Sequence, residues 1–102
     1  MPCRARLTAS VEHSPSGRLC LTILNNGPDE ARVIIVSVAD PSTGKDWTWM
    51  IEKPTVRRLA EGQTMGLEVG DGSGPVDLMV TISWVDNAGI PGMCSCPVTR
   101  GR

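Results

Sequence analysis

The sequence predicts an all-β fold, an antiparallel sandwich of seven or eight strands that forms a single domain over residues 1–102. Apolar residues recur at every second position in short segments, which is the period of a half-buried strand. The 11 glycines and 8 prolines fall between those segments, where turns are expected. A helix is not favoured, because the best candidate, residues 52–61, contains Pro54 and the β-branched Thr55 and Val56.

The first two strands are predicted over residues 4–12 and 18–25, which both alternate apolar and polar side chains. The Ser-Pro-Ser-Gly stretch at residues 14–17 has the composition of the turn that joins them. Asn26, Gly27, Pro28 and Asp29 then end the second strand. These signals predict a hairpin followed by a change of direction.

The next two strands are predicted over residues 31–40 and 45–52. The first contains the near-continuous apolar run VIIVSVA, which is typical of a central strand of a sheet. The second alternates, with Trp47, Trp49 and Ile51 expected on one face. A turn at residues 41–44 separates the two.

The remaining strands are predicted over residues 54–59, 64–69, 76–85 and 93–99, separated by polar and glycine-rich stretches. The segment around Trp84 alternates as regularly as any in the chain. A closed barrel is the competing all-β architecture. The sandwich is preferred because the run VIIVSVA and the strand that holds Trp84 look like the centres of two facing sheets.

The segment LCLTILNNGPDEARVIIVSV, residues 19–38, resembles the N-x-G-x-x-x-A-x-x-V segment of immunoglobulin-like modules in bacterial cell-surface and phage proteins. LAEGQTMGLEV and VTISWVDNAG are similar to the strands that follow in those modules, so the resemblance spans residues 5–99. It implies an immunoglobulin-like sandwich and a role as a spacer or binding module, with no catalytic residues. The inter-sheet cysteine pair of antibody domains is lacking, since residues 76–85 contain no partner for Cys20.

Composition argues against several classes of function. A formal net charge of -1 gives no general reason to bind nucleic acid, and no nucleic-acid groove is expected. No apolar run approaches the length of about 18 residues that a membrane-spanning helix requires. A short chain needs its apolar residues for the core, so an internal small-molecule site is not expected. The single histidine, His13, stands beside a turn without a catalytic context.

The four cysteines suggest no cofactor. Cys94 and Cys96 share one face of a strand and are poorly placed to pair with each other. Sandwich topology brings Cys3 near them and leaves Cys20 at the far end, so a disulfide from Cys3 to Cys94 or Cys96 is possible. Four reduced thiols are the alternative, and the spacing disfavours zinc.

Candidate interaction residues are polar side chains in two loops at one end of the sandwich and basic side chains near both termini. The loop residues could contribute to a protein interface, and the arginines could dock onto acidic neighbours. The candidates are Asn25, Asn26, Asp29, Asp86, Asn87, Arg4, Arg6, Arg100 and Arg102.

The predicted function is therefore non-enzymatic: a structural or interaction protein within a larger assembly, such as a phage capsid decoration or tail-associated protein. Its partners would be other protein subunits. The start MPCRARLTAS has no signal-peptide pattern, so we expect cytoplasmic synthesis and incorporation into a virion. The alternative is a carbohydrate- or cell-surface-ligand-binding module that uses Trp47 and Trp49. Both tryptophans also suit a core that has no Phe or Tyr.

Overall fold

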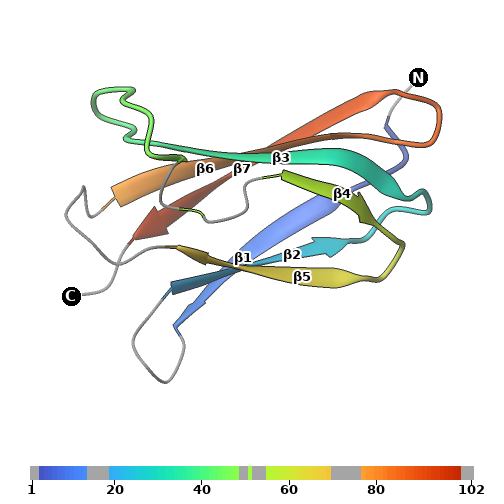
Figure 1. Cartoon of the computed structure of the whole chain (residues 1–102), viewed down its shortest axis with the longest axis horizontal. Coiled ribbons are helices and arrows are strands. Elements are labelled where there is room, and N and C mark those ends of the chain that lie inside the picture. Colours follow the sequence, from blue (N-terminus) through green and yellow to red (C-terminus); the bar gives the residue numbers. More distant parts are fainter. Residues whose placement is uncertain (1–2, 14–18, 49–50, 52–54, 70–76, 100–102) are drawn as a thin grey trace.

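Seven antiparallel strands form two sheets packed face to face (Figure 1). The computed structural model describes residues 3–13, 19–48, 51, 55–69 and 77–99. The strands are β1 (Leu7–His13), β2 (Leu19–Asn25), β3 (Ala31–Ala39), β4 (Thr55–Leu59), β5 (Thr64–Val69), β6 (Asp77–Val85) and β7 (Pro91–Thr99). The predicted all-β sandwich is confirmed. The expectation that the run VIIVSVA and the strand that holds Trp84 are the centres of two facing sheets is wrong, because β3 and β6 pair with each other in the middle of one sheet.

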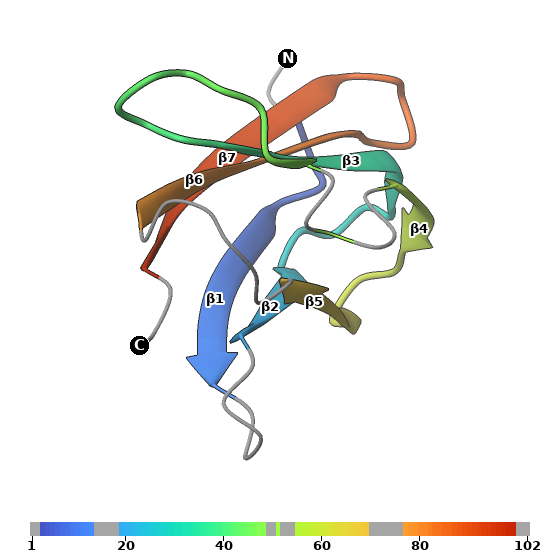
Figure 2. The same cartoon turned by 60° about the vertical axis from the view of Figure 1, so that its left-hand side comes forward.

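One sheet has the strand order β1-β2-β5 and the other has the order β4-β3-β6-β7. The chain crosses between the sheets after β2, β4 and β5, and the two layers are separate in Figure 2. No ladder joins the two sheets within the described strands, so the competing closed barrel is not formed. The described part of the chain also contains no helix that is long and apolar enough to cross a membrane.

The core lies between the sheets and is built by the period of two that the sequence displays. In β2 and β6 alternate residues are buried in the pattern expected from the sequence. The shared feature of these residues is a branched aliphatic or aromatic side chain that fills the space between the layers. They are Leu19, Leu21 and Ile23 in β2, and Leu78, Val80, Ile82 and Trp84 in β6.

The strand predicted over residues 45–52 is wrong for residues 45–48, and residues 49, 50 and 52 lie outside the described residues. Its first half is a loop in which only Asp46 forms an isolated bridge, to Ala39. The reason is local: the side chains of Asp40, Thr43 and Asp46 each accept a hydrogen bond from the backbone N–H two residues later. Such side-chain-to-backbone bonds compete with a strand ladder.

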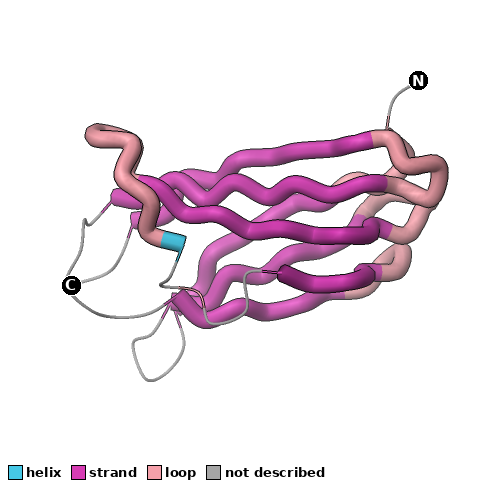
Figure 3. Tube along the Cα trace, turned by 45° about the horizontal axis from the view of Figure 1, so that its top comes forward, coloured by secondary structure: helices cyan, strands magenta, loops and turns pink. Residues whose placement is uncertain are grey.

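Three connections meet at one end of the sandwich: residues 26–30 after β2, 60–63 after β4 and 86–90 after β6 (Figure 3). We call this end the loop end. Backbone hydrogen bonds between Asn25 and residues 62 and 63 join two of these connections. The segment before β1 joins them too, which is why β1 begins at Leu7 and not at Arg4.

Candidate interaction surface

Asn25 builds the loop end from inside the molecule. Its Nδ2 group donates to the carbonyls of Asp29 (2.9 Å) and Leu59 (2.8 Å). Its Oδ1 accepts from the backbone N–H groups of Gly27 (3.0 Å) and Arg6 (3.3 Å). The residue is fully buried. Asn25 therefore cannot contact a partner, and its prediction as an interaction residue is wrong. Its buried side chain instead holds the following loop in place through these hydrogen bonds.

Asp86 does the same for the connection between β6 and β7. Its carboxylate accepts backbone N–H bonds from Arg4 (3.0 Å), Ala88 (2.8 Å) and Ile90 (2.9 Å). The Arg4 hydrogen bond is the main cause that lowers the pKa of Asp86, against the opposing effect of burial. Asp86 is buried, so it is also wrongly predicted as an interaction residue; its carboxylate instead caps the backbone of its own turn.

The other predicted residues of the loop end are at its surface or partly buried there. Arg4 is exposed and its Nε lies 3.6 Å from Asp29 Oδ1. Arg6, Asn26 and Asn87 are also exposed. Because Arg4 is largely exposed, its ion pair with the partly buried Asp29 contributes little to stability. Arg100 and Arg102 lie outside the described residues, so their predicted docking role stays a prediction.

The possible disulfide is not formed in this structure, because all four cysteines are free. The Cys3 thiol donates to the carbonyls of Ala5 and Ile90, both at 3.3 Å. Cys3 thus reaches the β6–β7 connection, near the strand that holds Cys94, as the topology predicted.

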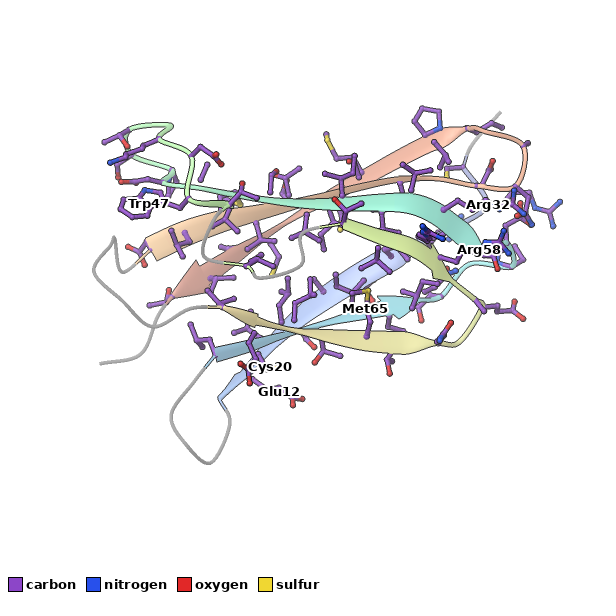
Figure 4. All side chains as sticks on the ribbon, viewed as in Figure 1. Glu12, Cys20, Arg32, Trp47, Arg58 and Met65 are labelled. Carbon is purple, nitrogen blue, oxygen red and sulfur yellow. The ribbon has the colours of Figure 1, made fainter. Side chains whose placement is uncertain are left out.

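Cys94 and Cys96 share one face of β7, as expected; this is the interior face, and each cysteine is half-buried. Burial is the main cause that raises the pKa of Cys94, and the neighbouring Cys96 adds to it. Cys20 lies at the opposite end of the molecule beside Glu12 (Figure 4). Within the described residues no three His, Cys, Asp or Glu side chains form a group that could hold a metal ion.

The tryptophans are placed differently from one another. Trp84 is buried and its Nε1 donates to the Ala5 carbonyl (2.8 Å). Trp47 is half-buried and packs against the core, with Lys45 Nζ 4.8 Å above its ring. Trp49 and the side chain of His13 lie outside the described residues. Because Lys45 covers one face of Trp47, that face is not free to stack on a sugar ring.

An apolar surface that the sequence pattern did not predict lies on the outer face of the four-stranded sheet. Val33, Ile35 and Met93 are 57%, 46% and 70% exposed, although they are large and apolar. They help to form an open groove of about 510 Å³, which we call the apolar groove. It is lined by Val33, Ile35, Ser83, Trp84, Val85, Pro91, Gly92 and Met93.

A β-bulge in β3 creates this surface. The register between β3 and β6 shifts between Arg32 and Ile35, so two consecutive residues, Arg32 and Val33, face solvent before Ile34 turns inward. Val33 has a φ of 51°, which is a strained value for a β-branched side chain. Strain of this kind is concentrated at functional sites. The bulge therefore places an apolar side chain in solvent at a conformational cost.

The side chains in and beside the apolar groove lie in rows that cross the four-stranded sheet. One row across the sheet, from β4 to β7, runs Arg58, Arg32, Val85 and Pro91. The next row of side chains on the same outer face, two residues farther from the loop end along β6, contains Ile35, Ser83 and Met93. Figure 4 shows Arg32 and Arg58 together near the loop end. The groove thus continues directly into two arginines, which we call the arginine pair.

A signal for the groove was present in the sequence but ambiguous. Val85 and Met93 stand at positions that alternation assigns to the outer face, where polar residues are usual. The run VIIV in β3 could not be divided into inner and outer residues, because all four are apolar. Only the bulge decides that Val33 and Ile35 are outside.

Comparison with known proteins supports the fold alone. No protein-family model matches this sequence, and no curated protein matches it. A crystal structure of a Bordetella pertussis protein described as ApaA is similar, with a TM-score of 0.53 and 18% sequence identity over 99% of each chain. At this level of identity the similarity carries no information about activity.

Proposed function

We propose that this chain is a non-enzymatic protein-interaction domain that binds a partner subunit of a larger assembly through the apolar groove. The observation that carries the proposal is the exposure of Val33, Ile35 and Met93 on one sheet face. Exposed apolar side chains that lie together on a surface mark interaction sites more often than isolated ones do. The strained bulge at Val33 supports the same site, because a residue without a role there would be expected to relax.

The kind of assembly is proposed from a different observation, which is a resemblance in the sequence. A phage capsid decoration or tail-associated protein is proposed from the resemblance of residues 19–38 to immunoglobulin-like modules of phage and bacterial surface proteins. The exposed loop-end side chains of Arg4, Arg6, Asn26 and Asn87 would lie at the edge of such a contact. Polar residues are usual at the rim of an interface whose centre is apolar.

The test compares the wild-type protein with a double variant, Ile35→Ser and Met93→Ser, in mixtures with virions and with fractionated lysate. Light scattering of the mixtures measures complex formation. We expect complexes with the wild type and at least a tenfold weaker association for the double variant, since each buried apolar side chain contributes about 1.5 kcal/mol or more.

The matched control is Ser37→Ala with Ser95→Ala, which changes two side chains one row away from the groove. These substitutions should leave association unchanged. Equal complex formation by the double variant, or a wild-type chain that stays alone in every mixture, would refute the proposed function.

A further inference from the structure

The border of the apolar groove carries an excess of positive charge on one side. Arg32 and Arg58 are opposite each other in the β3–β4 ladder. Like charges in this position repel each other. Both approach a single oxygen, Glu30 Oε1, with Nε–O distances of 3.1 Å and 3.8 Å. One carboxylate thus serves two guanidinium groups, and one positive charge is left over.

This positive charge is accessible. The side chains of Arg32 and Arg58 are 46% and 69% exposed, and Arg57 on the same edge strand is exposed as well. Among the described residues, Glu30 is the one acidic partner of the arginine pair. Guanidinium groups bind carboxylates in a planar, two-bond geometry. The arginine pair can therefore accept a second carboxylate from outside.

The opposite border of the groove is neutral. On the outer face, the row beyond Ile35, Ser83 and Met93 holds Ser37, Thr81 and Ser95. Ser37 Oγ donates to the Thr81 carbonyl, and the Thr81 and Ser95 hydroxyls are 3.4 Å apart. These hydroxyls are engaged and uncharged. The two borders thus differ in charge, and a bound segment would be oriented by that difference.

We infer that the segment bound in the apolar groove is a short acidic and apolar stretch of a partner protein, with an Asp or Glu at the arginine pair and an apolar side chain between Ile35 and Met93. This inference rests on the proposed function. The two rows of the groove are separated by two residues along a strand, a distance of about 7 Å, so one short segment can reach both. Three exposed apolar side chains are few for the roughly 800 Å² that each partner contributes to a standard interface, which favours a segment over a second copy of this domain.

The test is a selection from a displayed library of random peptides on the immobilised wild-type domain. We expect the selected peptides to be enriched in Asp or Glu close to Leu, Ile, Val or Met. The most enriched peptide is then synthesised with a fluorescent label, together with a version in which each Asp or Glu is replaced by its amide, and binding is followed by fluorescence anisotropy.

Two variants separate the charged from the apolar contribution. Arg58→Glu should weaken binding of the acidic peptide at least about threefold, and Arg58→Gln should weaken it less. Ile35→Ser should weaken both the acidic peptide and its amide version. Lys45→Glu, the same charge change at an exposed site in the loop after β3, far from the groove, should have no effect.

The outcomes distinguish this inference from the proposed function. Peptides that depend on Ile35 but lack acidic residues, or that bind Arg58→Glu unchanged, would overturn the inference and leave the groove as an interaction site. A selection that yields no peptide sensitive to Ile35→Ser would overturn the inference as well. Circular dichroism of each variant verifies that the fold is retained.

Discussion

The outer faces of the two sheets differ although both sheets are built from similar alternating strands. The three-stranded sheet exposes mainly polar residues in β1, β2 and β5, and its rows read Thr8-Leu24-Thr64, Ser10-Thr22-Gly66 and Glu12-Cys20-Glu68. The four-stranded sheet exposes the apolar groove beside the arginine pair. A solvated sheet face needs only polar side chains. Folding alone does not require apolar side chains on the outer face of the four-stranded sheet, and the proposed contact with a partner would account for them.

The largest expected effect comes from matched glycine substitutions in the two sheets. A Cβ at Gly92 would lie 2.6 Å from the ring of Trp84, whereas a Cβ at Gly66 would lie 3.3 Å from the sulfur of Cys20. Gly92→Ala should lower the free energy of unfolding by about 1–3 kcal/mol, because the ring must shift and loses its bond to Ala5. Gly66→Ala should change it by less than about 1 kcal/mol. Urea denaturation measures both.

If Gly92→Ala were as stable as Gly66→Ala, the packing of Trp84 beneath the groove would be looser than the structure indicates. Trp84→Phe is a useful second variant. It keeps most of the ring volume and removes the hydrogen bond to Ala5, so it should cost about 1 kcal/mol.

A second prediction concerns the conformational free energy that the β-bulge at Val33 costs. Val33→Asn should raise the free energy of unfolding by about 0.5–1 kcal/mol, since Asn tolerates a positive φ that strains valine. The same variant should weaken partner binding. Thr22→Asn, in the centre of the three-stranded sheet, should instead lower stability by up to about 1 kcal/mol. Thermal unfolding compares the two, and a destabilised Val33→Asn would contradict the assignment of strain.

A third prediction uses the pKa of Asp86, which supports the connection leading into the groove. Folding lowers this pKa below the ordinary value of 3.8. The carboxylate therefore stabilises the fold fully above pH values near 3.8, and this contribution is lost as the pH falls through the lowered pKa. Asp86→Asn should be less stable than the wild type at neutral pH and should lose less stability on acidification. Parallel acid dependence in the two proteins would disprove this role.

The smallest expected effect is a difference in thiol reactivity between the two sheets. Cys20 stands on the outer face of β2, whereas Cys94 faces the interior side of β7 and has a raised pKa. At pH 8 a smaller fraction of Cys94 is thiolate than at an ordinary cysteine, so iodoacetamide should modify it more slowly than Cys20. Peptide mass mapping over time measures the order, and faster modification of Cys94 would contradict it.

Local sequence patterns were sufficient to predict most strands, but they did not predict which residues reach the surface. Alternation in residues 18–25 and 76–85 predicted β2, β6 and their inward residues within a residue or two. It failed at residues 45–52, where Asp40, Thr43 and Asp46 bind their own backbone. It also failed for Asn25, since a polar residue next to a turn is ordinarily solvated and only its four partners make burial favourable.

The two-residue apolar period with Gly and Pro between segments was enough to predict antiparallel β-sheets, because half-buried strands must cover their apolar face with another β layer. It did not distinguish a sandwich from a closed barrel, which the strand order excludes. Which apolar residues stay on the surface depends on how the strands pair in the folded chain. Strand register is a non-local property, and the shift between Arg32 and Ile35 moves Val33 to the surface and Ile34 into the core. The position of the apolar groove beside two arginines follows from that register.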